Sequence, residues 1–283
     1  TYYEHQYSGE EIDAAVGRAM TGGALDTSVT NVSNQLGTFV RPTLLDNWYF
    51  GNPVNQRGKM EYTESGYTVD RWTTKEGVVS LSSSGLTLQN ITWLDQIIES
   101  PIYNRVYTVS LLTSDGVLFT ATGIVTEATS ISTKIDGGGY LHFGYSNNTS
   151  RYYVELARAD ANSPLSILAV KLEIGPTQTL AHQENGVWVL NEVPDYGEQL
   201  RRCQMDLFKI GDALHYCSLG NGVARDSQFV SITIPTPVTM RTMPILIAPP
   251  VGFAIRHNDT IVSGGANFSV DAFSQNSIML KVQ

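Results

Sequence analysis

Charged side chains are scarce in this chain of 283 residues, and basic ones most of all. Charged residues make up 16% of the sequence, and the formal net charge is −9, whereas about a quarter of a typical soluble domain is charged. A duplex nucleic-acid binder normally carries a basic stripe, so the composition argues against that class. The negative field also disfavours strongly anionic polymers as ligands. Neutral glycans remain possible ligands.

The residues that usually build disulfides and metal centres are few and scattered. The two cysteines, Cys203 and Cys217, form no CxxC pair, and we expect two buried free thiols. The five histidines are isolated from one another, which predicts no metal centre of the zinc type and no cofactor. A Ca²⁺ ion held by loop carbonyls and scattered Asp stays open. No run reaches the ~20 apolar residues of a membrane span, so no membrane insertion is expected.

Residues 1–43 predict a short helical region. Ser8 and Glu11 form a capping box, and apolar residues recur at helical steps in two segments between residues 12 and 36. Such a narrow seam is typical of helices that associate around an axis. We therefore expect this region to form a homotrimer and to attach the chain to other proteins, while docking of the helices on their own domain stays an alternative.

Residues 44–193 predict a β-sandwich of the jelly-roll kind. Apolar and polar residues alternate with a period of two in several segments, such as 86–88, 107–111 and 153–156. Ser-Gly, Asp-Gly and Gly-Gly-Gly sequences separate the segments, and the run at residues 137–139 predicts a hairpin tip. Many strands at this spacing without helices between them indicate a sandwich or jelly roll.

Residues 194–283 predict a linking helix followed by a smaller C-terminal β domain. Asp195 with Glu198 three positions later is typical of a helix start. We expect an apolar stripe that faces the protein, and Arg201 and Arg202 on the solvent side. The apolar stripe consists of Tyr196, Leu200, Cys203 and Leu207.

Three stretches carry a resemblance to a known family. They read LLDNWYFGNPVNQRGKMEYTESGYTVDRW from Leu44 to Trp72, AVKLEIG from Ala169 to Gly175, and DYGEQLRRCQ from Asp195 to Gln204. In these stretches the chain resembles the jelly-roll module of tail-fibre and receptor-binding proteins of phages and prophages of Gram-positive bacteria. The resemblance covers roughly residues 44–245. It implies a carbohydrate-binding-like jelly roll in a virion or phage-derived particle that acts outside the cell. The partners it implies are a bacterial surface polysaccharide and other tail or baseplate proteins.

Aromatic residues near polar loops give the candidate binding residues. Sugar rings stack on Trp and Tyr, while amide and guanidinium groups bond their hydroxyls. Trp48 and Trp72 lie in the family-like stretch, and we expect them in the core. The candidate glycan-binding residues are Trp93, Tyr145, Asn147, Asn148, Arg151 and Tyr152.

No catalytic residue is predicted. The sequence contains no GxSxG elbow and no HExxH motif, and these absences favour a binding protein. The enzymatic alternative is a secreted glycan-active enzyme or its accessory module, because glycoside hydrolysis needs only two carboxylates at a set separation. Asp95 and Glu99 are the pair we would inspect for it. A purely structural virion protein is the third hypothesis.

Overall fold

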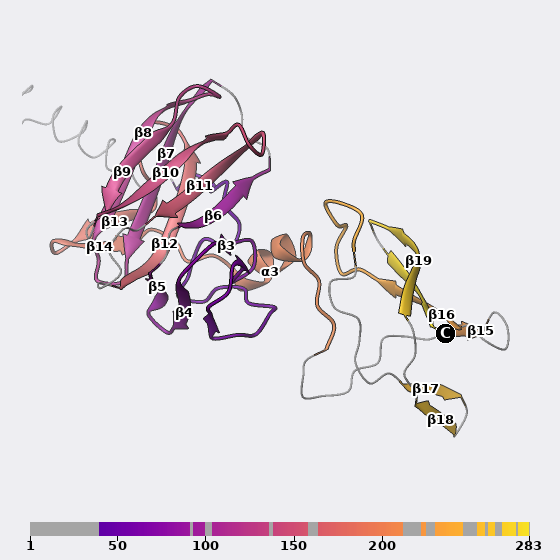
Figure 1. The fold of residues 1–283 in the computed structure, drawn as a ribbon. Helices are drawn as coiled ribbons and strands as arrows, with labels where there is room; N and C mark the ends of the chain where they lie inside the picture. The colour runs from indigo at the N-terminus through magenta and orange to yellow at the C-terminus, as the bar shows by residue number, and fades with distance from the viewer. Residues whose placement is uncertain are drawn as a thin grey trace, which may run out of the picture.

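The computed structural model shows a mainly β protein, as the sequence predicts (Figure 1). Residues 1–39 lie outside the described part, so the predicted N-terminal helices and the trimer seam are not addressed by it. Among the described residues, no helix is long and apolar enough to cross a membrane, and no cluster of His, Cys, Asp or Glu could hold a metal ion. The structure describes residues 40–90, 93–99, 104–135, 138–157, 164–211, 222–224, 230–245, 254–257, 260–263, 268–275 and 277–282.

Two six-stranded antiparallel sheets form the sandwich (Figure 1). The first sheet has the order β1 (Glu61–Tyr62), β4 (Val78–Ser82), β5 (Gly85–Gln89), β12 (Leu165–Ile174), β7 (Arg105–Thr113) and β8 (Leu118–Val125). The second has the order β2 (Gly66–Tyr67), β3 (Thr73–Thr74), β6 (Trp93–Ile98), β11 (Arg151–Ala157), β10 (Gly139–Ser146) and β9 (Ile131–Ile135). The consecutive strands β5 and β6 lie in different sheets. Their partners β12 and β11 are also consecutive in the chain and also lie in different sheets.

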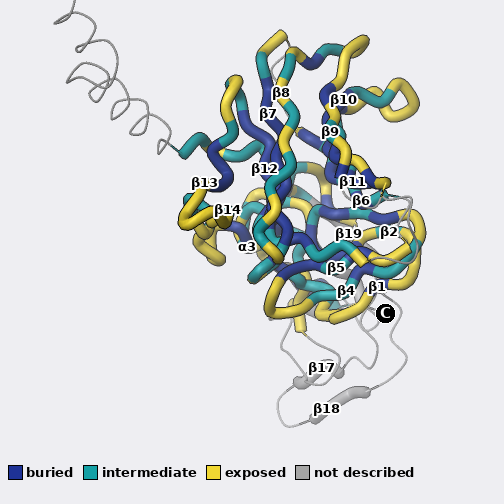
Figure 2. The backbone as a smooth tube through the Cα atoms, turned by 90° about the vertical axis from the view of Figure 1, so that its left-hand side faces the viewer, coloured by how far each residue is buried: buried dark blue, intermediate teal, exposed yellow. Residues whose placement is uncertain are grey.

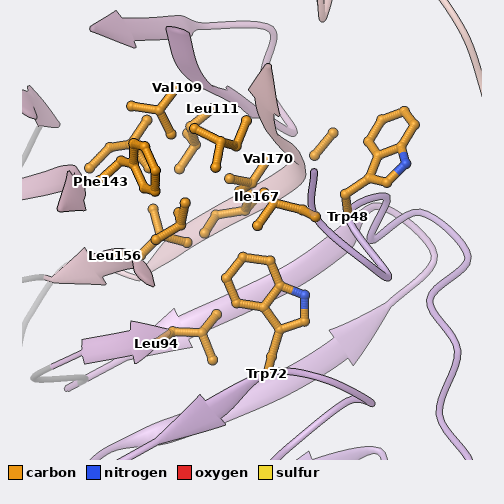
Figure 3. Close-up of a cluster of buried hydrophobic side chains, with 14 of the residues drawn as sticks. Trp48, Trp72, Leu94, Val109, Leu111, Phe143, Leu156, Ile167 and Val170 are labelled. Atoms are coloured by element: carbon orange, nitrogen blue, oxygen red, sulfur yellow. The ribbon is translucent and has the colours of Figure 1, made fainter. Parts of the chain in front are cut away.

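The core lies between the two sheets and is made of the inward-facing residues of each strand. Figure 3 shows Leu94, Phe143 and Leu156 from the second sheet together with Val109 and Val170 from the first. Trp48 and Trp72 are 2% and 0% exposed, which confirms their predicted place in the core. In Figure 2 the buried segments run along β7 and β12, and the exposed ones gather at turns.

The remaining elements follow the sandwich in the chain. They are the hairpin β13 (Ala181–Glu184) and β14 (Val187–Leu190), the helix α3 (Tyr196–Gln204), and a four-stranded sheet of β15 (Gly222–Ala224), β16 (Val230–Pro235), β20 (Ser277–Val282) and β19 (Phe268–Ser274). A separate hairpin pairs β17 (Ala254–His257) with β18 (Thr260–Ser263). The small C-terminal β domain expected from the sequence is therefore present. The strands that flank the predicted Gly-rich tip, β9 and β10, pair antiparallel with Gly139 opposite Ile135, and residues 136–137 of the tip lie outside the described residues.

Helix α3 begins as predicted, but it turns a different face inward. The Asp195 side chain accepts a 2.8 Å hydrogen bond from the Glu198 amide. The buried residues of the helix are Gln199 and Cys203, whereas Tyr196 is exposed, so the predicted apolar stripe is wrong at its first position. Cys203 is a buried free thiol, as expected, while Cys217 lies outside the described residues. Its contacts with the sandwich include polar groups, since Gln199 accepts from the Asn47 amide and Arg202 pairs with Asp46.

The three family-like stretches meet in one structural unit. The Leu44 amide donates to the Leu172 carbonyl at 2.8 Å, and the Val170 amide donates to the Trp48 carbonyl at 3.0 Å, so residues 44–50 run along β12. The Asn47 amide donates to the Gln199 side chain of α3 at 2.8 Å. The three stretches are therefore in contact with one another in the fold.

A cluster of arginine and aspartate side chains joins this unit to the C-terminal part of the chain. Asp46 is nearly fully buried and forms ion pairs with Arg71 at 3.0 Å, Arg241 at 2.9 Å and Arg202 at 2.6 Å. Burial alone would raise the pKa of Asp46, but the positive charges of these arginines outweigh burial and hold the pKa below its usual value. Arg202, which we predicted on the solvent side, thus points toward a buried anion.

Candidate functional site

The outer face of the second sheet carries the candidate site. A strand turns alternate side chains to opposite faces, and β10 and β11 turn their core residues, such as Phe143 and Val154, inward. The outward positions of these strands hold Tyr140 and His142 on β10, and Tyr153 and Glu155 on β11. The position on β6 that pairs with Glu155 is Asp95.

Strand register places four polar side chains in one row across the sheet. Thr73 pairs with Asp95, Asp95 with Glu155, and Glu155 with His142. Directly opposite residues of an antiparallel pair have Cβ atoms about 4.5–5.5 Å apart. We call the surface formed by Asp95, Tyr140, His142, Tyr153 and Glu155 the acid–aromatic face.

Hydroxyl groups orient the two carboxylates. The Thr73 hydroxyl donates to Asp95 Oδ1 at 2.6 Å, and the Tyr140 hydroxyl donates to Glu155 Oε1 at 2.6 Å. Burial, followed by the charge of Glu155, raises the pKa of Asp95 despite the Thr73 hydrogen bond. Burial together with the hydrogen bond and charge of Glu155 raises the pKa of Tyr140 to about 12. Tyr140 therefore stays a protonated donor at neutral pH.

Three rings stand next to the carboxylates. The His142 ring lies 6.2 Å from the Tyr140 ring and 5.6 Å from the Tyr153 ring, measured between centroids. Burial lowers the pKa of His142, although Glu155 opposes the shift, so the imidazole is neutral at pH 7. Gly144 leaves the room that this ring occupies, since a Cβ at that position would lie 2.5 Å from His142 Nε2. Partly open rings beside hydrogen-bonding groups are the arrangement that binds sugars.

The residues predicted from sequence do not form one site. Tyr152 is 3% exposed and contacts Tyr145, its ring 5.0 Å away, on the core side of the sheet; a buried ring offers no face to a ligand. Asn147, Asn148 and Arg151 are exposed at the tip of the β10–β11 hairpin.

Trp93 lies far from that hairpin tip. It pairs with Ala157 at the other end of β11, six residues from Arg151, or about 20 Å at the rise of a strand. The ring is half-buried on the outer face, and Lys75 Nζ lies 4.1 Å from its centroid. Trp93 therefore flanks the acid–aromatic face and already makes a cation–π contact.

The carboxylate pair chosen from sequence is also different in the structure. Glu99 accepts an ion pair from Arg71 at 2.9 Å, and the carboxylate directly opposite Asp95 is Glu155. Sequence reasoning missed Tyr140, His142 and Glu155. The signal that could have found them is the alternation in 139–146 and 151–157, where Tyr-x-His and Tyr-x-Glu occupy the positions opposite to the core residues.

Comparisons with protein-family models, with curated proteins and with solved structures found no match for this chain.

Proposed function

We propose that this protein binds carbohydrate through the acid–aromatic face and serves as the receptor-binding part of a phage or prophage tail fibre. The observation that carries the binding proposal is the in-register row of Thr73, Asp95, Glu155 and His142, with Tyr140 and Tyr153 beside it. Carboxylates and phenol groups bond sugar hydroxyls, while the rings pack against C–H faces. Tyr140 is 39% exposed, which favours a ligand surface over a purely structural role.

The tail-fibre part of the proposal is supported by the sequence resemblance and the β-sandwich fold. In such a fibre each chain would bind a bacterial surface glycan weakly. Three chains on one axis would gain avidity, because the second and third binding events occur at a high effective concentration. The trimer itself is supported by the apolar seam between residues 12 and 36.

A glycan array probed with the intact chain tests the binding proposal. We expect Tyr140→Ala and Tyr153→Ala to weaken binding to the best ligand roughly tenfold or more, as truncation of aromatic anchors does. Tyr196→Ala is the matched control, because Tyr196 is an exposed tyrosine on α3. Loss of binding in the control, or full binding in both face variants, would refute the proposed site.

Glycoside hydrolysis is a second candidate, favoured by one observation. Asp95 and Glu155 are directly opposed on neighbouring strands, and retaining glycosidases hold their two carboxyl groups about 5 Å apart. Asp95, with its raised pKa, would be the acid and Glu155 the nucleophile. New reducing ends from a bound oligosaccharide, lost in Asp95→Asn while binding persists, would establish this activity in place of simple attachment.

A further inference from the structure

The acid–aromatic face carries two negative charges without a cationic partner among the described residues. Neither Asp95 nor Glu155 forms an ion pair with a described Lys or Arg, and the groups that bond their oxygens are the hydroxyls of Thr73 and Tyr140. His142, the nearest group that could become positive, has a lowered pKa through burial. Two lysines lie at the border of this face: Lys75 lies over Trp93, and Lys134 is opposite Tyr140 on the edge strand β9. Neither forms an ion pair with Asp95 or Glu155 in the part of the chain that the structure describes.

Like charges directly opposite each other destabilise a sheet. The pair of Asp95 and Glu155 therefore does not favour folding, and this points to a role in binding. Two other acids, Asp46 and Glu99, form ion pairs with arginines. The pair on the outer face is instead surrounded by the rings of Tyr140, His142 and Tyr153. Aromatic faces attract cations, and charge-assisted hydrogen bonds to carboxylates are stronger than neutral ones. Rings and carboxylates therefore favour the same kind of ligand group, a positively charged donor.

A compact ammonium group fits this arrangement better than a bare metal ion. Ca²⁺ takes six to eight oxygen ligands, and the described residues contain no cluster of acids that could hold a metal ion. An ammonium has three donors, which two carboxylates and a neighbouring sugar hydroxyl can satisfy. The apolar rim of the same sugar can then lie against the tyrosine rings.

We propose that the glycan recognised at the acid–aromatic face contains an amino sugar with a free, protonated amino group, which binds between Asp95 and Glu155. This inference rests on the proposed carbohydrate-binding function and names the class of sugar. It excludes N-acetylated sugars as the preferred ligand, because an acetyl group removes the charge and one or more of the donors.

Paired oligosaccharides test the proposal directly. We would titrate the full chain by calorimetry with an oligomer of glucosamine and with an N-acetylglucosamine oligomer of the same length. The titrations would be done near pH 6, where a free amine is protonated, because amino groups have a pKa of about 8. The glucosamine oligomer should bind roughly 10- to 100-fold more tightly, the range expected for a hydrogen bond to a charged group. Added salt should weaken this preference.

Neutralising either carboxylate should remove the preference. Asp95→Asn and Glu155→Gln each keep a side chain of the same shape, and each should bring the two affinities within about threefold of each other, because the charged partner is gone. Glu184→Gln is the matched control: it removes one negative charge from the β13–β14 hairpin, which belongs to neither sheet of the sandwich. Thermal melts of all three variants check that they are folded.

The outcomes separate the inference from the proposed function. Equal affinity of the wild type for both oligomers, lost in Tyr153→Ala, would overturn the amino-sugar inference and leave carbohydrate binding in place. Binding of neither oligomer would overturn the inference too, and the glycan array would then decide whether any sugar binds. Equally tight binding of a lysine oligomer through the same carboxylates would show that the face reads a cationic peptide, which would overturn the proposal.

Discussion

The backbone amide of Asn47 donates a 2.8 Å hydrogen bond to the side-chain oxygen of Gln199, which lies 152 residues later in the chain. Asn47 has a φ of 51°, a left-handed conformation that asparagine tolerates better than most residues. Its side-chain amide donates to the carbonyls of Val54 and Asp70 at 2.9 and 2.8 Å. Its own carbonyl accepts from the Trp72 indole at 3.0 Å. One asparagine thus fixes the turn after Leu45, the second tryptophan and the linking helix.

This arrangement predicts that Gln199→Ala destabilises the fold. Truncation leaves the buried amide of Asn47 without its acceptor, and an unsatisfied buried donor costs about 1–3 kcal/mol. Denaturant unfolding should show the loss, with Arg201→Ala on the exposed side of α3 as control. A loss of similar size in the control would show that helix propensity, rather than this hydrogen bond, is responsible.

The elements were predictable from the sequence where local rules determine them. The period-two pattern of 107–111 and the cap at Asp195 with Glu198 depend on residues close together in the chain, and both are found in the structure. The inward face of α3 was not predictable, since the partner of the buried Gln199 is the amide of Asn47, 152 residues earlier in the chain. The acid–aromatic face was missed for a similar reason. Asp95 and Glu155 become neighbours through the β6–β11 register, which no local pattern specifies.

The charge cluster around Asp46 predicts acid sensitivity. The pKa of Asp46 in the folded protein is below its usual value of about 3.9. Its contribution to stability is therefore complete above the unfolded pKa and is lost as the pH falls through the folded pKa. Asp70 and Asp206 have raised pKa values, mainly through burial, so they shift stability in the opposite direction and must be separated from Asp46.

The Asp46→Asn variant separates the stability contribution of Asp46 from those of Asp70 and Asp206. At neutral pH the variant should lose roughly 2–5 kcal/mol, because Arg71 and its neighbours keep their charges in a partly buried site. The difference from the wild type should shrink as the pH falls below about 4. Urea unfolding over a pH series measures it, with the exposed Glu127→Gln as reference. A difference that stays constant with pH would contradict the lowered pKa of Asp46.

For the pair of Asp95 and Glu155 we expect the opposite effect on stability: removing a charge here should not destabilise the protein. Asp95→Asn should leave stability unchanged or raise it by about 0.2–1 kcal/mol, because the repulsion from Glu155 disappears and the new side-chain oxygen still accepts from Thr73. Thermal unfolding without ligand measures this effect, and Thr73→Val reports the value of the hydrogen bond itself. Clear destabilisation by Asp95→Asn would mean that a cationic group of the protein already neutralises the pair.

The sequence pattern between residues 12 and 36 predicts that the chain is a trimer and that this region holds it together. Helical segments of this length are marginal in isolation, so their apolar seam needs a partner, and three seams around one axis supply it.

Light scattering at several concentrations should give three chains per particle for the full sequence and a smaller mass after removal of residues 1–40. The shortened chain should still fold, because the buried residues of the sandwich core run from Leu45 to Ala181. It should bind an immobilised glycan roughly 100-fold more weakly, since avidity is lost while each face stays intact. A monomer in both forms, with equal affinity for the glycan surface, would end the multivalent explanation and leave the single face as the whole of the binding site.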